Sequence, residues 1–252
     1  MADAAEPIGG LIIHLERATG RAAHVASLLN ALPVEAEVLS AIDARAEDAE
    51  GGETWRHDPA LGLSPRYPFP LSETEVAVFL SHRRAWARIV AAGWRAGLVL
   101  EDDVTLDPVA FPAAYGLAAK VLNEDRFVRL PMKDRENAGE TVSERAGVRA
   151  VRPSVVGLNL QASLVGRGAA QQLLAASERF DRPVDSWLQM TWDHGVDILS
   201  IWPSGVGEIS GDLGGSTQKK RKGITARLRA EVARGRYRAA IARMSAGSRT
   251  KG

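Results

Sequence analysis

The sequence contains no cysteine among its 252 residues. This absence excludes disulfides, thiol nucleophiles and cysteine metal sites, so any metal must be bound by oxygen or imidazole groups. The chain also lacks an apolar run long enough to cross a bilayer. Residues 1–7 are acidic and lack the basic start and apolar core of a secretory signal. We therefore expect a cytoplasmic protein.

The net charge of +1 conceals an uneven distribution of charge along the chain. Residues 218–252 contain twelve Lys and Arg and one acid, Glu231, whereas residues 1–217 contain 20 basic and 30 acidic residues. The tail therefore carries +11 and the body −10. A difference of this size indicates that the tail and the body have different roles.

The apolar pattern alternates between predicted strands and predicted helices. Strands are predicted over residues 8–15, 36–42, 97–100, 127–130, 154–165 and 196–202, and helices over 19–32, 110–122 and 167–177. Ser72, with Glu75 three residues later, forms a capping-box pattern that begins a further helix. This alternation predicts an α/β fold with a Rossmann-like, mainly parallel sheet and flanking helices.

Two stretches interrupt this alternation. Residues 44–70 contain four prolines and no sustained period, which predicts a long irregular connection of a kind that is often functional. Residues 131–150 are polar and turn-rich, which predicts a hairpin or a mobile loop. For the whole chain, we expect a flexible N-terminus over 1–9, a main domain over 10–211 and a basic tail over 212–252.

The predicted strand over 97–100 runs directly into three carboxylates, Glu101, Asp102 and Asp103. A buried strand cannot carry unpaired charges, so these side chains must face a cleft where a cation, protons or polar partners offset their repulsion. In α/β sheets, ligands bind at such carboxyl ends of strands. Two nearby carboxylates suit a divalent cation that also binds substrate phosphate oxygens. The alternative is an acidic surface turn.

A more specific signal comes from two linked segments. Residues 71–82 read Leu-Ser-Glu-Thr-Glu-Val-Ala-Val-Phe-Leu-Ser-His, and residues 98–104 read Leu-Val-Leu-Glu-Asp-Asp-Val. Together they resemble glycosyltransferase family 25, the family of lipopolysaccharide and lipooligosaccharide galactosyltransferases. Further segments follow in the family's order, namely 11–15 with Arg21, 40–44, 162–170, 182–185 and 201–203. The resemblance covers about residues 10–210, and it departs from the family at His14, where Asn is usual.

The resemblance implies a type A glycosyltransferase fold, also called the nucleotide-diphospho-sugar transferase fold. It implies a UDP-hexose donor, commonly UDP-galactose, a saccharide acceptor and inversion at the anomeric carbon. The departing nucleoside diphosphate gains negative charge, which Mn²⁺ or Mg²⁺ would stabilise. On this basis we expect Asp103 and Glu101 to hold the metal, and Asp102 to assist at the donor.

Four further residues are candidates for binding the donor. Arg21 could reach diphosphate oxygens, and His82, with Ser81 beside it, could donate to a phosphate or position the acidic cluster. Asp43 could contact the ribose. Each has an ordinary alternative, because a helical histidine is usually a core residue, an arginine is usually solvated, and an aspartate can simply end a strand.

Inversion requires a carboxylate that takes the proton from the acceptor hydroxyl, and Asp185 is the candidate for this base. The alternative is that Asp185 caps the helix that follows it, in which case Asn would serve as well. Trp187 and Trp192 flank this region, and their rings could stack on the acceptor sugar. Most tryptophans, however, are core residues.

Residues 224–244 predict a basic amphipathic helix suited to an anionic membrane surface. Its apolar stripe consists of Ile224, Leu228, Val232, Ala240, Ile241 and Met244. The alternative is that this stripe packs against the main domain. We expect the membrane role, which places the protein peripherally on the inner face of the membrane, near a lipid-linked saccharide acceptor.

The function that we expect is transfer of a hexose, galactose as first choice, in lipopolysaccharide or related bacterial cell-envelope glycan synthesis. Two other functions stay open. The basic run 219–222 could bind nucleic acid phosphates, although the acidic body argues against a nucleic acid partner. A family member without catalytic activity could instead serve as a sugar-binding module.

Overall fold

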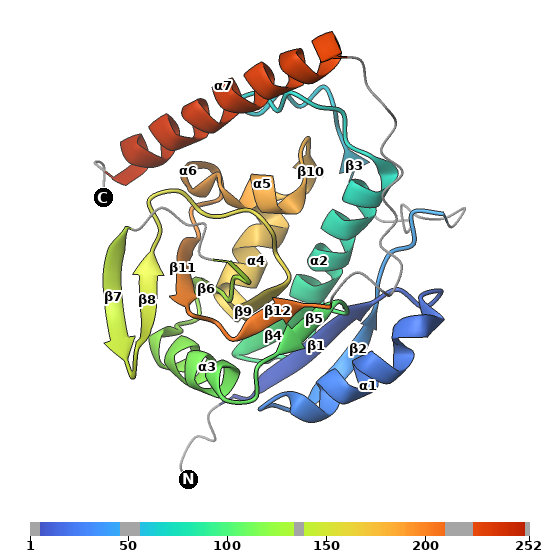
Figure 1. Cartoon of the computed structure of the whole chain (residues 1–252), viewed down its shortest axis with the longest axis vertical. Helices are drawn as coiled ribbons and strands as arrows, with labels where there is room; N and C mark the ends of the chain where they lie inside the picture. The colour runs from blue at the N-terminus through green and yellow to red at the C-terminus, as the bar shows by residue number, and fades with distance from the viewer. Residues whose placement is uncertain (1–5, 46–55, 134–138, 210–223, 250–252) are drawn as a thin grey trace.

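The computed structural model of the protein describes residues 6–45, 56–133, 139–209 and 224–249. Its centre is an eight-stranded sheet with the strand order β2-β1-β4-β9-β6-β11-β8-β7 (Figure 1). The strands of this sheet are β1 (Ile8–His14), β2 (Ala36–Ser40), β4 (Ala96–Glu101), β6 (Arg126–Arg129), β7 (Glu140–Arg145), β8 (Val148–Arg152), β9 (Ala162–Gly166) and β11 (Asp197–Trp202). Two short pairs are separate, β3 (Arg56–His57) with β10 (Arg179–Phe180), and β5 (Val104–Leu106) with β12 (Val206–Glu208).

Helices cover both faces of the sheet (Figure 1). They are η1 (Thr19–Arg21), α1 (Ala22–Ala31), α2 (Glu73–Ala91), α3 (Ala110–Val121), α4 (Arg167–Ala176), α5 (Val184–Leu188), α6 (Thr191–His194) and α7 (Ile224–Arg249). Helices α1 and α3 lie on one face, and α2, α4 and α5 lie on the other. Helix α7 lies beyond α5 and α6, at the top of the view in Figure 1. No helix in the described ranges is both long and apolar enough to span a membrane.

The strands bury side chains on both faces, as the nearly continuous apolar runs predict. In β1, Leu11 and Ile13 join the core that contains α2 and α4, whereas Ile12 joins the core that contains α1 and α3. In β4, Val99 and Leu100 divide in the same way. Because successive residues of a strand point to opposite faces, one short run supplies both cores.

The sheet is mixed, which corrects part of the prediction. Strands β2, β1 and β4 are parallel to one another, and β6 is parallel to β11. Strand β9 is antiparallel to both β4 and β6, and β8 is antiparallel to β11 and β7. Six of the eight strands therefore share one direction, and β8 and β9 oppose it. The α/β prediction is confirmed, whereas the parallel character is confirmed only for part of the sheet.

The predicted strand over 154–165 is half wrong, since β9 begins only at Ala162. The residues before it form a loop in which Asn159 has a φ of 69°. The Arg129 guanidinium donates to the carbonyl of Leu158 at 3.0 Å and to that of Asn159 at 2.5 Å. A side chain thus satisfies these carbonyls in place of a neighbouring strand. The polar stretch over 131–150 contains the β7–β8 hairpin, one of its two predicted forms.

The first strand begins at Ile8, where the apolar pattern predicts it, and therefore overlaps the segment 1–9 that was expected to be flexible. Ile8 and Gly9, placed in the flexible segment 1–9, belong to β1, where they pair with Ala96 and Gly97 of β4. The Arg95 N–H also donates to the carbonyl of Pro7 at 3.0 Å. Residues 1–5 lie outside the described ranges.

The predicted helix of the tail is confirmed as α7, but it buries a different stripe. Ile241 is 1% exposed and Ser245 5%, whereas Leu228 is 66% exposed and Val232 47%. The side of the helix that packs on the domain therefore centres on Tyr237, Ile241 and Ser245, and the predicted apolar stripe is divided between inside and outside. The basic run 219–222 lies outside the described residues.

Candidate active site

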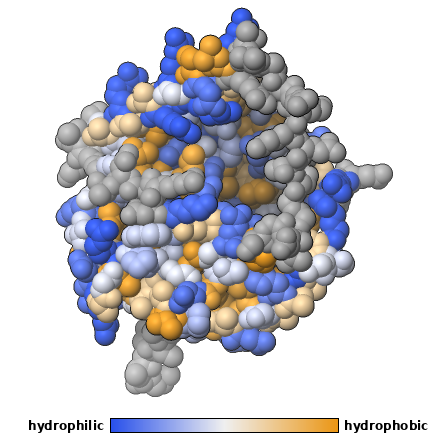
Figure 2. All heavy atoms as spheres, viewed as in Figure 1, coloured by the Kyte–Doolittle hydropathy of each residue, from blue (hydrophilic) through white to orange (hydrophobic). Residues whose placement is uncertain are grey.

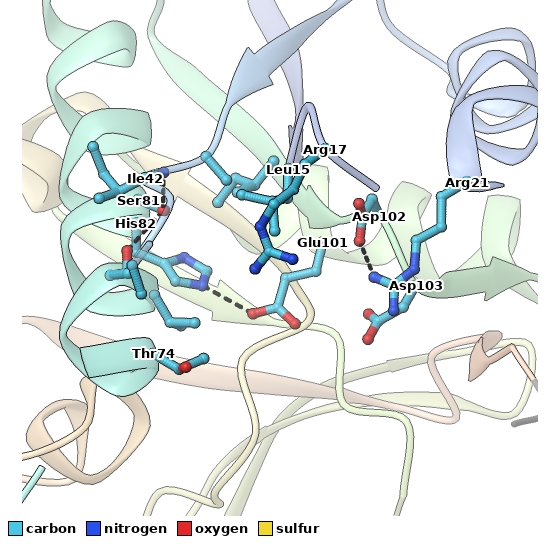
Figure 3. Close-up of a pocket in the computed structure, with 15 residues that line it drawn as sticks. Leu15, Arg17, Arg21, Ile42, Thr74, Ser81, His82, Glu101, Asp102 and Asp103 are labelled. Atoms are coloured by element: carbon cyan, nitrogen blue, oxygen red, sulfur yellow. Dashed lines mark hydrogen bonds and ion pairs between the residues drawn. The ribbon is translucent and has the colours of Figure 1, made fainter. Parts of the chain in front are cut away.

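A pocket of about 320 Å³ lies where β1, β2 and β4 end (Figure 3). Its lining residues come from the ends of β1 and β4, from η1, from the segment after β2 and from the first half of α2. They are Ile13, Leu15, Arg17, Arg21, Ala41, Ile42, Ala44, Thr74, Ala77, Val78, Ser81, His82, Glu101, Asp102 and Asp103. We call this the acidic pocket.

Strand register brings these segments together. Ile13 pairs with Glu101 of β4, and His14 pairs with Ser40 of β2. Because the three strands are parallel, their carboxyl ends meet at the same edge of the sheet. Helix α2 begins there with the capping box predicted from the sequence, in which the Ser72 side chain accepts from the Glu75 N–H at 3.2 Å.

Asp102 is held by two partners at the edge of the acidic pocket. Its Oδ1 accepts from Arg21 Nη1 at 2.5 Å, and its Oδ2 lies 2.6 Å from His14 Nδ1. The side chain of Asp102 is only 9% exposed. Both oxygens are therefore engaged by the protein, and Asp102 fixes Arg21 in place. His14, the departure from the family pattern, is explained as a partner of Asp102.

Glu101 and His82 form a second pair. His82 Nε2 lies 3.2 Å from Glu101 Oε1, and His82 is 2% exposed. Ser81 connects α2 to the segment after β2, since its hydroxyl donates to the carbonyl of Ala77 and accepts from the Ile42 N–H, both at 2.8 Å. Ser81 thus anchors the pocket wall, and His82 orients Glu101.

Asp103 differs from Asp102 because one of its oxygens has no hydrogen-bond partner in the described part of the chain. Its Oδ1 is buried without a hydrogen-bond partner. Burial, and next the charge of Glu101, raise the pKa of Asp103 to about 6. An unsatisfied buried carboxylate oxygen is costly, and a bound cation is one partner that would offset this cost. Figure 3 shows the carboxylates of Glu101 and Asp103 projecting in the same direction.

These carboxylates fit a divalent cation that is shared with a substrate. Within the described ranges, no three His, Asp or Glu side chains are grouped closely enough to form a metal site by themselves. Mg²⁺ and similar hard cations often take one or two carboxylates and complete their coordination with phosphate oxygens and water. Asp103 and Glu101 are the residues that would form the protein part of such a site.

Arg17 lines the acidic pocket and is a residue that the sequence analysis missed. Its only signal was its place just after the first strand, in the turn before η1. Arg17 Nε donates to Asp43 Oδ2 at 2.7 Å, and the Arg45 N–H donates to Asp43 Oδ1 at 2.9 Å. The Arg45 amide, together with Arg17, lowers the pKa of Asp43. Asp43 lies at the rim, between the lining residues Ile42 and Ala44.

Asp185 lies apart from the acidic pocket, in the first turn of α5. Its Oδ1 accepts from the Ser186 N–H at 2.6 Å, and its Oδ2 accepts from the Asn159 N–H at 3.0 Å. The N-cap position of α5 is Pro183, so Asp185 is not the N-cap residue. Its carboxylate does, however, join the start of α5 to the loop before β9.

Trp187 cannot stack on an acceptor sugar in this structure, which corrects the role predicted for it. It is 0% exposed and packs against Phe79, Trp86 and His194. The apolar area of an indole ring favours this core position. Trp192 is partly buried against the same core.

The comparison with protein families agrees with this geometry. The family model described as Glycosyltransferase family 25 (LPS biosynthesis protein) matches residues 8–188, a range that includes the whole acidic pocket. The chain belongs to glycosyltransferase family 25. The resemblance inferred from its two linked motifs is therefore confirmed.

Three curated relatives are similar over part of the chain. A Glycosyltransferase 25 family member of Anopheles gambiae is 31% identical over 113 residues, or 43% of this chain and 18% of that protein. Its counterpart in Drosophila pseudoobscura pseudoobscura is 30% identical over 122 residues, or 46% of this chain and 18% of that protein. Procollagen galactosyltransferase 1 of Danio rerio is 30% identical over 97 residues, or 38% of this chain and 16% of that protein. The matched stretches thus cover less than a fifth of each relative.

Proposed function

We propose that this family 25 chain transfers a hexose, galactose as first choice, from a UDP-sugar to a saccharide acceptor with inversion. Three observations support the proposal: the family, the name of the Danio rerio relative, and the acidic pocket. The observation that carries it is the buried, unsatisfied oxygen of Asp103 beside Glu101, in a pocket that Arg17 and Arg21 also line. We interpret the sheet, with these carboxylates after a central strand, as a type A glycosyltransferase fold.

In this proposal the donor diphosphate binds in the acidic pocket. Bound Mn²⁺ or Mg²⁺ would supply positive charge that offsets the charge developing on the departing UDP. Asp103 and Glu101 hold the cation, and His82 orients Glu101. Arg21, which Asp102 fixes, and Arg17 face the diphosphate oxygens. Guanidinium groups suit this task because they carry a permanent charge and several donors.

Asp185 is the proposed base, because inversion needs a carboxylate at the acceptor hydroxyl. Its two bonds to backbone N–H groups fix the orientation of the carboxylate and leave further lone pairs on both oxygens. The substitution Asp185→Asn separates this role from a structural one. We expect turnover to fall by at least about a hundredfold while UDP binding is retained. The unfolding midpoint should fall only slightly, because the Asn amide nitrogen cannot accept one of the two backbone N–H bonds. Turnover that falls less than tenfold would show a structural role only.

We further propose that α7 holds the protein at an anionic membrane surface, near a lipid-linked acceptor of a lipopolysaccharide-like glycan. Its outward side carries Leu228 and Val232, which are 66% and 47% exposed, together with the exposed Arg236 and Arg243. Exposed apolar and basic groups on one helix suit such a surface. Sedimentation with phosphatidylglycerol vesicles, but not with phosphatidylcholine vesicles, is the expected result. Equal sedimentation with both would contradict it.

The transferase proposal is tested by the release of UDP from a panel of UDP-sugars. UDP-galactose, UDP-glucose and UDP-N-acetylhexosamines are incubated with the protein, with Mn²⁺ or with EDTA, and with water or a saccharide as acceptor. We expect release from a UDP-hexose that requires the metal. UDP-sugar binding without release would favour the inactive sugar-binding module. Neither binding nor release, with strongly salt-dependent binding to nucleic acid, would favour a nucleic-acid-binding protein.

A further inference from the structure

A larger pocket, of about 660 Å³, lies between α7 and the main domain. We call it the α7 pocket. It is lined by Tyr67, Phe69, Glu75, Val155, Val156, Gly157, Leu158, Asn159, Ser186, Gln189, Arg234, Tyr237, Arg238, Ile241 and Ala242. On the face of the molecule seen in Figure 2, recessed apolar atoms lie below α7 beside hydrophilic ones. The lining residues combine apolar, aromatic and polar groups, as ligand sites in proteins commonly do.

Three aromatic rings, those of Tyr67, Phe69 and Tyr237, lie together in this lining, and we call them the aromatic corner. The Tyr67 ring lies edge-to-face with Tyr237, with centroids 5.3 Å apart, and edge-to-face with Phe69 at 5.8 Å. All three side chains are half-buried. Rings of this kind present apolar faces to the C–H surface of sugars. The α7 pocket thus offers the stacking surfaces that the buried Trp187 does not.

The wall opposite α7 is fixed by buried groups. Asn159, which lines the α7 pocket, has its carbonyl bound to the fully buried Arg129 and its N–H bound to Asp185. Burial lowers the pKa of Arg129 to about 10, although the group stays cationic at neutral pH. Asn159 is also held at a φ of 69°, a conformation that non-glycine residues adopt infrequently. Such a constrained wall is formed before a ligand binds.

Two contacts relate the α7 pocket to the proposed chemistry. Asp185 hydrogen-bonds to the backbone of Asn159 and Ser186, both of which line the pocket, so the proposed base is at its edge. At the start of α2, Thr74 lines the acidic pocket and the next residue, Glu75, lines the α7 pocket. The two pockets therefore have neighbouring lining residues in the first turn of α2.

A buried arginine joins the two sides of the α7 pocket. Arg182, which is 0% exposed, pairs with Asp181 at 2.6 Å and donates to the carbonyl of Leu63 at 2.9 Å. It also donates to the carbonyl of Pro65 at 3.0 Å and to the Tyr237 hydroxyl at 3.2 Å. Arg182 thus fixes both the segment before Tyr67 and the helix that carries Tyr237.

The α7 wall also carries positive charge. Arg238 is exposed at the pocket, and Arg234 lies with its guanidinium carbon 5.3 Å from the centroid of the Phe69 ring. Arg234 also pairs with Glu231, outside the lining. Two arginines beside an aromatic corner suit a ligand that combines a sugar ring with a carboxylate or phosphate.

We propose that the α7 pocket binds the acceptor, and that this acceptor is a saccharide whose anionic group faces Arg234 and Arg238. The assignment rests on the proposed transferase function. In it, the C-terminal helix is part of the acceptor site, the aromatic corner stacks on the sugar, and Asp185 faces the hydroxyl that attacks the donor.

The test compares a neutral and an anionic saccharide on matched variants of the full chain. Lactose and sialyllactose are the probes, and their dissociation constants are measured by ligand-observed NMR in the presence of UDP and Mn²⁺. The double variant Arg234→Gln/Arg238→Gln removes the two pocket charges. The control Arg145→Gln/Arg229→Gln removes two exposed arginines that do not line the pocket.

We expect sialyllactose to bind the unaltered protein more tightly than lactose. In Arg234→Gln/Arg238→Gln, its affinity should fall at least about tenfold, to the level of lactose, whereas the control keeps the preference. Equal effects of the two double variants, or no binding of either probe to the unaltered protein, would overturn the proposal.

UDP binding is measured on the same samples. If UDP binds but sialyllactose shows no dependence on Arg234 and Arg238, the acceptor assignment fails and the transferase proposal stands. If UDP binds to none of the samples, the transferase proposal itself fails.

Discussion

The acidic pocket and the α7 pocket are built in different ways. The acidic pocket is formed by residues 13–103, mostly at the ends of three parallel strands and along one helix. The α7 pocket combines residues 67–75, 155–159 and 186–189 of the domain with residues 234–242 of α7. The Tyr237 hydroxyl accepts from Arg182, and Ile241 is buried against the domain. The acidic pocket is thus formed by the sheet and α2, whereas the α7 pocket also requires the packing of α7 on the domain.

Charge is distributed differently as well. In the acidic pocket, Asp102 is satisfied by Arg21 and His14, while Asp103 keeps an unsatisfied oxygen. Near the α7 pocket, both oxygens of Asp185 are bound to backbone N–H groups. A carboxylate without partners suits a cation, whereas one with a fixed orientation suits proton transfer. The following predictions separate the two pockets experimentally.

The largest effect is expected at Asp103. With UDP-galactose and Mn²⁺, Asp103→Asn should lower the rate of UDP release by at least about 10³-fold, which equals about 4 kcal/mol of transition-state stabilisation. Binding of sialyllactose in the α7 pocket should persist. The control is Asp193→Asn, an exposed carboxylate outside both pockets, which should keep its rate. A loss of less than tenfold for Asp103→Asn would contradict the role of the acidic pocket.

A large effect on stability is expected at Arg182. Arg182→Ala leaves the buried Asp181 without its charged partner and with only the Leu63 N–H, and it should lower the free energy of unfolding by about 3–5 kcal/mol, measured by urea denaturation. The control is Arg179→Ala, three positions earlier, which removes an exposed pair with Asp58 and should change the midpoint little. Similar midpoints for the two variants would show that Arg182 does not connect α7 to the domain.

The next prediction concerns the pH dependence of stability, which the buried His194 should influence. Burial lowers the pKa of His194 to about 4, and the neutral ring lies 3.1 Å from the carbonyl of Leu188. In the unfolded chain the ring binds a proton near pH 6.5, so its contribution is complete above that pH and is lost as the pH falls toward 4. Relative to His194→Gln, the free energy of unfolding of the unaltered protein should decrease by as much as about 3 kcal/mol across this window. The difference between the two profiles cancels the titration of other groups, such as Asp103, whose raised pKa falls in the same window. A difference that stays constant with pH would refute the assignment.

The smallest effect on stability is expected at the N-terminus of α2, where Ser72 is the N-cap. Ser72→Ala removes the side-chain bond to the Glu75 N–H and should cost about 1 kcal/mol of stability. Glu75→Gln, which keeps a carbonyl oxygen for the Ser72 N–H, should cost less. An equal loss for both variants in urea denaturation would argue against the capping box.

The acidic pocket could largely be predicted from the sequence, whereas the α7 pocket could not. The acidic strand, its neighbours and the capping box at Ser72 were predicted because each depends on a local pattern of apolar, polar and capping residues. Because parallel strands end at one edge, these elements also brought Glu101, Asp103, His82 and Arg21 together. Arg17 was missed, since a lone arginine in a turn carries no pattern.

The rest could not be predicted because it depends on tertiary packing. Trp187 and Tyr237 are both aromatic residues near charged ones, but only the assembled core buries the first and leaves the second at a pocket. The loop before β9 was predicted as strand because its apolar residues resemble one, whereas Arg129 and Asp185 hold it in another conformation. The side of α7 that packs inward is chosen by Arg182 and the rings near it, which lie far away in the sequence.

The most direct test of the account is calorimetric titration of UDP-galactose into the unaltered protein, with Mn²⁺ and again with EDTA. The account predicts binding at the acidic pocket that weakens at least about tenfold without the metal, because Asp103 and Glu101 then repel the diphosphate instead of sharing a cation with it. Equal affinity in Mn²⁺ and EDTA, or no binding in either, would contradict the assignment of this pocket to a metal-assisted nucleotide-sugar donor.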